Sequence, residues 1–176
     1  MILAFDTYYY QDKAKTVCLA FRDWQTDSAF DIYAEVATGI EQYIPGEFYK
    51  RELPCIISVL KNFDLKDVEY IIVDGYVYLD DNVKPGLGAH LYEALDKRVP
   101  VIGVAKTNFA TLNTNKSCLL RGKSVRPLFI TSAGVNLNKA TMLIKNMSGE
   151  NRIPTLLKKL DTFTKELTTT NKFILP

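Results

Sequence analysis

Three short apolar segments of this chain each lead to a charged residue, and this pattern restricts the fold more than any other feature. The segments and the residues at their ends are 2–5 with Asp6, 70–73 with Asp74, and 99–104 with Lys106. Apolar runs of this length are typical of strands buried within a sheet. A helical pattern at 87–97 separates the last two segments, so we expect a parallel strand–helix–strand crossover.

The remaining segments predict helices around a mixed sheet. Residues 14–22 and 28–37 are interpreted as strands joined by a polar turn, which gives the chain an antiparallel opening. Pro54 suits the first turn of a helix that runs to about Phe63, because proline lacks an N–H that is not needed there. The other expected elements are a loop at 75–86, a bent hairpin at 117–132, and helices at 136–147 and 155–167. The sequence therefore predicts a single α/β domain over residues 1–176, with residues 168–176 frayed.

The composition excludes several classes of protein. With 47% hydrophobic and 24% charged residues, the chain is globular rather than disordered or fibrous. Its apolar runs fall well short of the ~18 residues of a membrane-spanning helix, and Asp6 interrupts the N-terminal segment too early for a secretory signal. Cys18, Cys55 and Cys118 lack Cys-x-x-Cys spacing and a histidine-rich surrounding. We therefore expect a cytoplasmic protein with reduced thiols and no membrane contact.

The charges are unevenly distributed along the chain. The net charge is +2, yet the stretch from Lys97 to Gly149 holds nine basic residues and no Asp or Glu. If the fold gathers these side chains on one face, that face would attract a polyanion such as nucleic acid. The alternative is that they are scattered, solvated lysines and arginines.

The three charged strand ends also predict a site. The carboxyl ends of parallel strands meet at one edge of a sheet, so Asp6 and Asp74 are expected in the same crevice. Two adjacent carboxylates repel each other unless a cation or proton neutralises them, and Mg²⁺ prefers such oxygen ligands. Glu52 is a candidate third ligand, and Lys106 could stabilise a phosphate in the transition state. The alternative for each aspartate is that it only ends a strand or turn.

Ordered motifs along the chain point to a known family. They are Phe5-Asp6-Thr7-Tyr8, Tyr43-Ile44-Pro45-Gly46, Arg51-Glu52-Leu53-Pro54, Val73-Asp74-Gly75, Gly86-Leu87-Gly88-Ala89-His90-Leu91, Val101-Ile102-Gly103-Val104-Ala105-Lys106, Pro127 to Gly134, and Arg152-Ile153-Pro154-Thr155. In this order and spacing, from about residue 2 to residue 160, the chain resembles the endonuclease V family. The resemblance implies a ribonuclease H-like fold, in agreement with the mixed sheet expected above.

The resemblance also implies an activity. Asp6, Glu52 and Asp74 would hold Mg²⁺, for which Mn²⁺ could substitute, and Lys106 would lie beside the scissile phosphate. The reaction would be hydrolysis of a phosphodiester 3′ to an inosine (hypoxanthine) nucleotide in DNA, with RNA left open as a further substrate, leaving a 3′-hydroxyl and a 5′-phosphate. The partners would be DNA or RNA with deaminated bases, and nothing in the sequence decides between the two or fixes the oligomeric state.

Further residues correspond to the family's substrate-binding positions. Tyr43, Ile44, Pro45 and Gly46 match a wedge that fills the gap left by an extruded base, with Arg51 nearby. Gly75 and Gly134 match segments whose main chain forms the base pocket. Tyr8, His90 and Asn136 are candidate supporting residues around the site, although a structural role is the alternative for His90.

The chain departs from the family at two histidines. After Asp74 and Gly75 the family has a glycine-rich run ending in His-Pro, whereas this chain continues to Asp80 and Asp81. A later family histidine corresponds to Val135. Either Asn136, Asp80, Asp81 or water replaces these histidines, or the reaction is slower. A rival hypothesis is therefore a binding module that retains inosine-containing strands without cleaving them. A phospho-receiver domain fits poorly, because such domains do not open with antiparallel strands.

Overall fold

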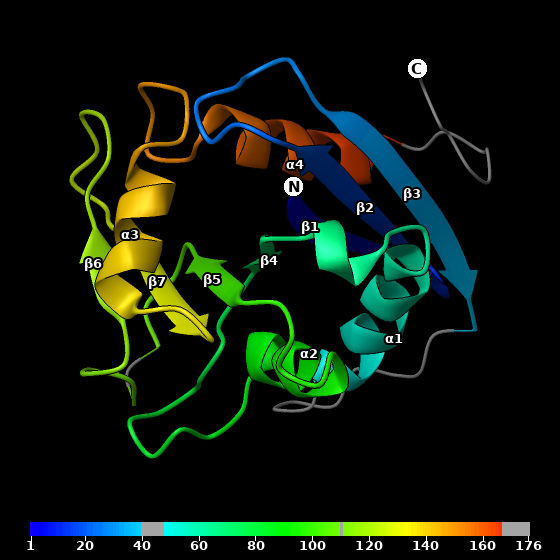
Figure 1. Ribbon diagram of the computed structural model, residues 1–176, viewed down its shortest axis with the longest axis horizontal. Coiled ribbons are helices and arrows are strands. Elements are labelled where there is room, and N and C mark those ends of the chain that lie inside the picture. The colour runs from blue at the N-terminus through cyan, green and yellow to red at the C-terminus, as the bar shows by residue number, and fades with distance from the viewer. Residues whose placement is uncertain (40–47, 110, 167–176) are drawn as a thin grey trace.

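A seven-stranded mixed sheet forms the centre of the computed structural model, which describes residues 1–39, 48–109 and 111–166 (Figure 1). The strands lie in the order β3-β2-β1-β4-β5-β7-β6. They are β1 (Ile2–Tyr10), β2 (Lys13–Phe21), β3 (Asp31–Thr38), β4 (Tyr70–Asp74), β5 (Val101–Ala105), β6 (Ser117–Leu119) and β7 (Leu128–Ala133). The helices are α1 (Phe48–Leu60), α2 (Leu87–Ala94), α3 (Leu137–Lys145) and α4 (Thr155–Lys165), with a 3-10 turn η1 (Leu65–Asp67). The expected ribonuclease H-like α/β fold is confirmed.

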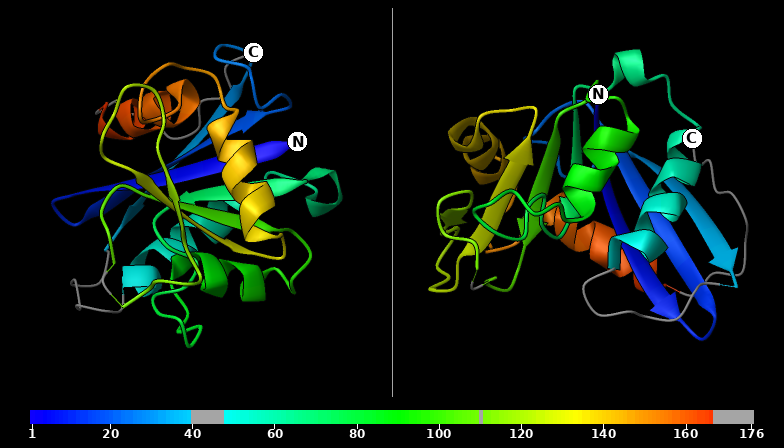
Figure 2. Two further views of the ribbon diagram at one scale, coloured as in Figure 1. Left: turned by 90° about the vertical axis from the view of Figure 1, so that its left-hand side faces the viewer. Right: turned by 90° about the horizontal axis from the view of Figure 1, so that it is seen from below.

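Helices cover both faces of the sheet (Figures 1 and 2). Successive side chains of a strand point to opposite faces. On β1, Leu3 and Phe5 therefore join the core under α1 and α2, whereas Ile2 and Ala4 join the core under α3 and α4. By the same alternation, the side chain of Asp6 points to the face covered by α3 and α4.

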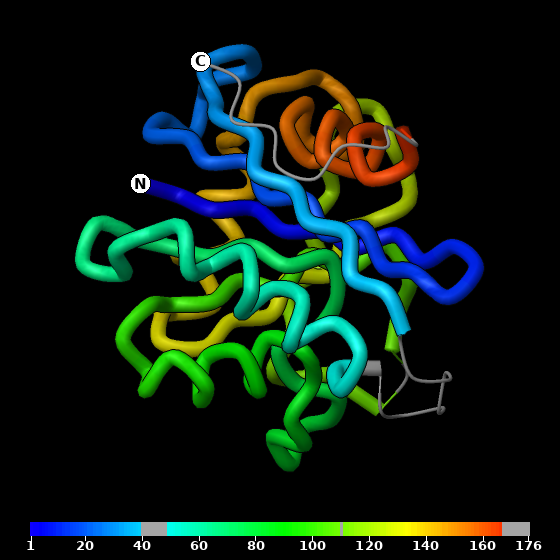
Figure 3. The backbone as a smooth tube through the Cα atoms, turned by 90° about the vertical axis from the view of Figure 1, so that its right-hand side faces the viewer, coloured from blue at the N-terminus to red at the C-terminus, as the bar shows by residue number. Residues whose placement is uncertain are grey.

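The strand pairing confirms the expected topology. β1, β4 and β5 are parallel neighbours, and β2 and β3 extend the sheet with antiparallel pairing (Figure 3). On the other side β7 pairs antiparallel with β5 and with β6, as the expected hairpin at 117–132 requires. The parallel crossover runs from β4 through α2 to β5.

The first strand is longer than its apolar run indicates. Asp6 does not end β1, which continues to Tyr10. Its parallel pairing with β4 stops at the Phe5–Val73 pair, but its antiparallel pairing with β2 continues to Tyr10 and Lys13. Asp6 therefore marks the position where the parallel neighbour ends, which opens space beside its side chain.

The first helix also begins earlier than predicted. Pro54 lies inside α1 rather than in its first turn, and its side chain is exposed. The earlier start places Glu52 within the helix, where it is buried. At the other boundary, α2 ends at Ala94 rather than at residue 97, because Asp96 and Lys97 adopt left-handed backbone with φ of 52° and 60°.

The C-terminal helix is anchored by a buried lysine. Lys15, on β2, donates hydrogen bonds to the carbonyl oxygens of Phe163 at 2.7 Å and Glu166 at 2.5 Å. Cations near a helix C-terminus are favourable because the last carbonyls lack intrahelical partners. The frayed tail expected at 168–176 lies outside the described residues. Within the described ranges, no helix has the length and apolarity needed to cross a bilayer.

The basic stretch from Lys97 to Gly149 does not form one free positive face. Lys97 and Arg98 pair with Glu93 and Asp96, and Lys106 pairs with Asp74. Arg121 is buried. Lys116 is half-buried and donates hydrogen bonds to Asn108 and Phe109. Lys123, Arg126, Lys139 and Lys145 are exposed, so the attraction to a polyanion is restricted to part of the surface.

Candidate functional site

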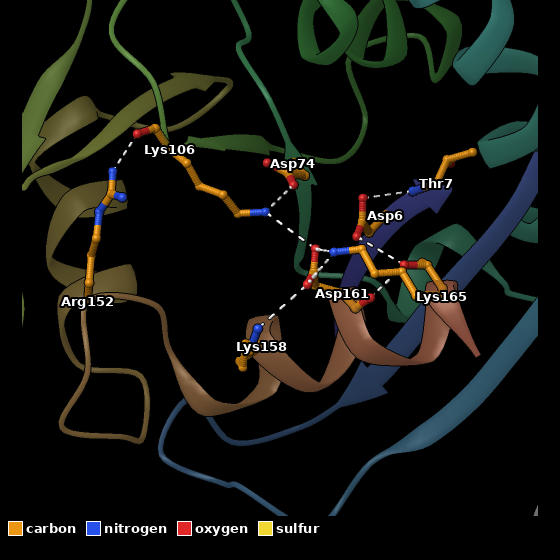
Figure 4. Close-up of polar contacts among 9 residues, drawn as sticks. Asp6, Thr7, Asp74, Lys106, Arg152, Lys158, Asp161 and Lys165 are labelled. Carbon is orange, nitrogen blue, oxygen red and sulfur yellow. Dashed lines mark hydrogen bonds and ion pairs between the residues drawn. The ribbon is translucent and has the colours of Figure 1, made fainter. Parts of the chain in front are cut away.

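Asp6, Asp74 and Lys106 come together at one edge of the sheet, as the strand ends predicted (Figure 4). Asp74 is the last residue of β4, and Lys106 follows β5 directly. Alternation along the strands directs all three side chains to the face covered by α4. The ammonium of Lys106 donates a hydrogen bond to Oδ2 of Asp74 at 2.7 Å.

Asp6 is half-enclosed between the sheet and α4. Its Oδ1 accepts a hydrogen bond from the Thr7 N–H at 2.9 Å, and its Oδ2 accepts one from the Thr164 hydroxyl at 3.5 Å. Burial, and next the nearby charge of Asp74, raise the pKa of Asp6 to about 6, although Lys106 opposes the shift. The site therefore holds a carboxylate that favours a proton or another cation.

Glu52 approaches from the other layer of the fold. It lies on α1, only 3% of its surface is exposed, and its Oε2 has no hydrogen-bond partner among the described residues. Burial raises the pKa of Glu52 well above its usual value, and the charges of Asp6 and Asp74 raise it further. The neighbouring Arg51 lies with its guanidinium carbon 4.1 Å from the centre of the Tyr9 ring. Glu52 is thus an electrostatic neighbour of both aspartates.

A fourth carboxylate at this edge escaped the sequence analysis. Asp161, on α4, lies 3.8 Å from Lys106, 2.9 Å from Lys165 and 3.8 Å from Lys158 (Figure 4). Burial would raise the pKa of Asp161, but these lysines outweigh it and lower the pKa. The sequence held one signal, an acid flanked by lysines three residues before it and four after it, but such spacing is common on solvated helices.

The donor chemistry of this edge suits a hard divalent cation. In the conformation of the structure, no three Asp, Glu, His or Cys side chains of the described ranges already surround one ion-sized point. However, one oxygen of Glu52 lacks a hydrogen-bond partner among the described residues, and the charges of Asp6 and Asp74 raise the pKa of Glu52. The charge of Asp74 also raises the pKa of Asp6. A divalent cation bound by these oxygens would neutralise the three carboxylates. Lys106 is the cation that neutralises Asp74 in this structure.

The two glycines assigned to a base pocket lie beside different parts of β5. Gly75 follows Asp74, which pairs with Val104 near the end of β5. Gly134 follows Ala133, which pairs with Val101 at the start of β5. The two glycines therefore lie near opposite ends of that strand, and their joint assignment to a base pocket stays a prediction. The antiparallel direction of β7 causes the separation, and the order of motifs along the chain does not reveal strand direction.

Glycine is nevertheless required at both positions by the backbone. Gly75 has φ of +136° and Gly134 has φ of +74°, which L side chains rarely adopt. A Cβ at Gly134 would also lie 2.8 Å from the ring of Tyr92. Gly75, at the carboxylate edge, stays a candidate for close approach by a base.

The residues considered as replacements for the family histidines have structural partners. Asp80 accepts hydrogen bonds from the backbone of Asn82 and Lys84, and Asp81 accepts them from residues 113–115. Asn136 caps α3, at the far end of β7 from Asp74. Asp161, rather than any of these, is the additional polar group beside Asp6 and Lys106.

The other predicted supporting residues make contacts with neighbouring aromatic rings. His90 stacks on Tyr49 with ring centres 3.6 Å apart, and burial lowers its pKa. Tyr8 stacks on Tyr10 with ring centres 6.1 Å apart. Tyr43, Ile44, Pro45 and Gly46 lie outside the described residues, so the wedge assignment stays a prediction.

Comparisons with known proteins agree with the fold and the motif order. The family model for endonuclease V matches residues 1–121. Endonuclease V of Bacillus thuringiensis subsp. konkukian is 26% identical over an alignment of 188 positions, which covers 91% of this chain and 77% of that protein.

Solved structures share the architecture at lower sequence identity. Endonuclease V of Streptomyces avermitilis superposes with a TM-score of 0.70 at 20% identity, over 93% of this chain and 79% of that one. Endonuclease V of Ciona intestinalis, solved in complex with a 24-mer DNA containing an inosine followed by a ribo-adenosine, gives a TM-score of 0.77 at 15% identity. That match covers 94% of this chain and 84% of the Ciona chain.

Proposed function

The chain belongs to the endonuclease V family, and on that premise we propose that it is a metal-dependent endonuclease acting on inosine-containing nucleic acid. The bond it hydrolyses would be the phosphodiester 3′ to the deaminated nucleotide, leaving a 3′-hydroxyl and a 5′-phosphate. The Ciona intestinalis relative was solved with an inosine-containing DNA, which supports inosine as the recognised feature.

One observation carries this proposal. Asp6, Asp74 and Lys106 lie at one edge of the sheet. The buried Glu52 is close enough to Asp6 and Asp74 that their charges raise its pKa. Neighbouring carboxylates are costly to keep charged without a cation. Their placement at one edge is therefore better explained by a cation-dependent reaction than by stability.

Asp6, Glu52 and Asp74 would hold the Mg²⁺ ion, and Mn²⁺ could substitute for it. When bound, the ion lowers the pKa of its water and stabilises negative charge on the phosphate and leaving oxygen. The flexible, half-exposed side chain of Lys106 can move from Asp74 to a phosphate oxygen once a cation neutralises that carboxylate.

Lys106 enters the reaction as a charged group. Burial would lower the pKa of Lys106, but its hydrogen bond to Asp74 and the charges of Asp74, Asp6 and Asp161 outweigh burial and raise the pKa. At neutral pH it therefore donates hydrogen bonds and supplies positive charge rather than accepting a proton.

The proposal is tested by incubating the protein with a labelled strand that contains one inosine, in Mg²⁺ and separately in Mn²⁺. D74N is the matched variant, because it removes the charge and keeps the shape of the side chain. We expect a single cut 3′ to inosine by the wild type and none by D74N. Equal cutting by both proteins would refute the assignment, and tight retention without any cut would establish the rival binding module.

A further inference from the structure

A basic groove lies beside the carboxylate edge and is not used by the proposed chemistry. It has a volume of about 1130 Å³ and is lined by the turn after Arg121 and by the segment leading into α4. Its charged lining residues are Lys123, Glu150, Arg152, Lys158 and Lys159. Four cations thus face one carboxylate, in a part of the surface that is open to solvent.

The walls of this groove are held in place by two arginines. The buried Arg121 donates hydrogen bonds to the carbonyl oxygens of Lys145, Met147, Gly149 and Asn151, at distances from 2.5 to 3.3 Å. Arg152 donates to the carbonyl oxygens of Lys106 and Pro127. Because one guanidinium binds four carbonyls between the end of α3 and the start of α4, the groove is a formed feature of the fold.

Contacts of two lining residues link the groove to the carboxylate edge. Lys158 lies 3.8 Å from Asp161, and Asp161 lies 3.8 Å from Lys106 (Figure 4). Arg152 joins the groove to the end of β5 through the Lys106 carbonyl. A strand whose phosphate lies at Lys106 can therefore continue into the groove.

The lysines of the groove differ in how many contacts they already make within the protein. Lys159 donates to the carbonyl oxygen of Asp27 at 2.6 Å and lies over the ring of Phe30. Lys123 is exposed and has no hydrogen bond or ion pair with the residues described. Lys123 is therefore the cation most available to an anionic ligand.

We propose that this groove binds the sugar-phosphate backbone of the nucleic-acid strand where it leads away from the cleaved bond. Lys123 and Lys158 would contact phosphates, and the groove would add affinity without reading the bases. This inference rests on the proposed function, because it assigns the ligand of the same site.

The test measures binding separately from cleavage. Fluorescence anisotropy with D74N protein, a single strand containing one inosine, and a series of salt concentrations gives both the affinity and its salt dependence. We expect K123A, made in the D74N background, to weaken binding of inosine and undamaged strands by the same factor. It should reduce the slope of log K against log salt by about 0.7, the value for one lost phosphate contact on a single strand.

K66A is the matched control, because Lys66 lies on η1, away from the groove, and its side chain has no partner among the residues described. A second variant, K123E, should weaken binding further than K123A. Strands shortened from the 5′ or the 3′ end show which part of the ligand the groove holds. The K123A effect should disappear for one of the two shortened series.

An unchanged affinity and salt slope in both K123A and K123E would overturn the inference. So would a loss in K66A equal to that in K123A, because the effect would then reflect net charge alone. If the wild type cuts beside inosine while the Lys123 variants behave as wild type, only the groove assignment fails. If the wild type neither binds nor cuts the strand, the proposed function fails as well.

Discussion

The ammonium of Lys106 lies 2.7 Å from Oδ2 of Asp74, at the ends of two neighbouring parallel strands. It lies 3.8 Å from Asp161 on α4, so one cation is shared between a sheet carboxylate and a helix carboxylate. A cation bound at Asp74 would compete with this ion pair. The side chain best placed to reach a phosphate is thus also the one that neutralises the site in the structure described here.

Replacing Lys106 with methionine should reduce the cleavage rate by about 10² to 10³, the effect typical of losing one group that stabilises transition-state charge. Methionine keeps most of the side-chain length, so the fold should be retained. Single-turnover kinetics on an inosine strand measure the rate, and circular dichroism checks the fold. A rate within a factor of two of wild type would show that Lys106 plays no part in the reaction.

Asp6 should make the metal-free protein less stable as pH rises. Its pKa is about 6 in the folded protein against a usual value of 3.8, so between these pH values the folded state binds more protons than the unfolded state. The free energy of unfolding should therefore fall through this window, by at most about 3 kcal/mol. Urea unfolding in EDTA at several pH values measures this loss.

D6N is the control for that experiment, since its side chain cannot titrate. The stability of D6N should fall less between pH 4 and pH 6 than that of the wild type. Identical pH profiles for the two proteins would show that Asp6 is not the source of the dependence.

The charged form of Glu52 should also lower the stability of the metal-free protein. Its carboxylate is buried, Oε2 lacks a hydrogen-bond partner among the described residues, and its pKa is raised. In EDTA at pH 8, E52Q should unfold at a higher temperature than wild type, with a difference that shrinks as the pH approaches 4.5. Thermal denaturation measures both.

Addition of Mg²⁺ should reverse that order. A cation that binds only the folded state stabilises it, by about 2.7 kcal/mol at 100 times its dissociation constant. The wild type should gain stability, and E52Q and D74N should gain less. A gain of the same size in E52Q and wild type would remove Glu52 from the ligand set.

Arg121 should be a strong determinant of stability. R121A would remove four hydrogen bonds to carbonyl oxygens at the end of α3 and in the loop before α4, and leave these oxygens without this donor. We expect a loss of more than about 2 kcal/mol in the free energy of unfolding. Chemical denaturation measures it, and R126A, at an exposed position of the same segment, should change stability by less than about 0.5 kcal/mol.

Local sequence patterns were sufficient to predict the strands whose ends are marked by a charged residue. The apolar runs before Asp74 and Lys106 predicted both strands and the edge at which their charged residues meet, because burial on both faces leaves a continuous apolar segment. Asp6 was placed at the correct edge, although β1 continues beyond it. That continuation depends on β2 as a partner, which a short window of sequence cannot show.

Long-range relationships were the part that the sequence could not supply. The distance between Gly75 and Gly134 follows from the antiparallel direction of β7, and a motif carries no information on strand direction. Asp161 reached the site because α4 packs across β1 and β2, which joins segments that are distant in the chain. The start of α1 before Pro54 likewise reflects tertiary packing, which can override local helix preferences.

The hydrogen bond from Thr164 to Asp6 joins residues 158 positions apart. During synthesis, the first strand leaves the ribosome long before the last helix that closes over it. The contact between Asp6 and α4 therefore forms only after α4 has been synthesised.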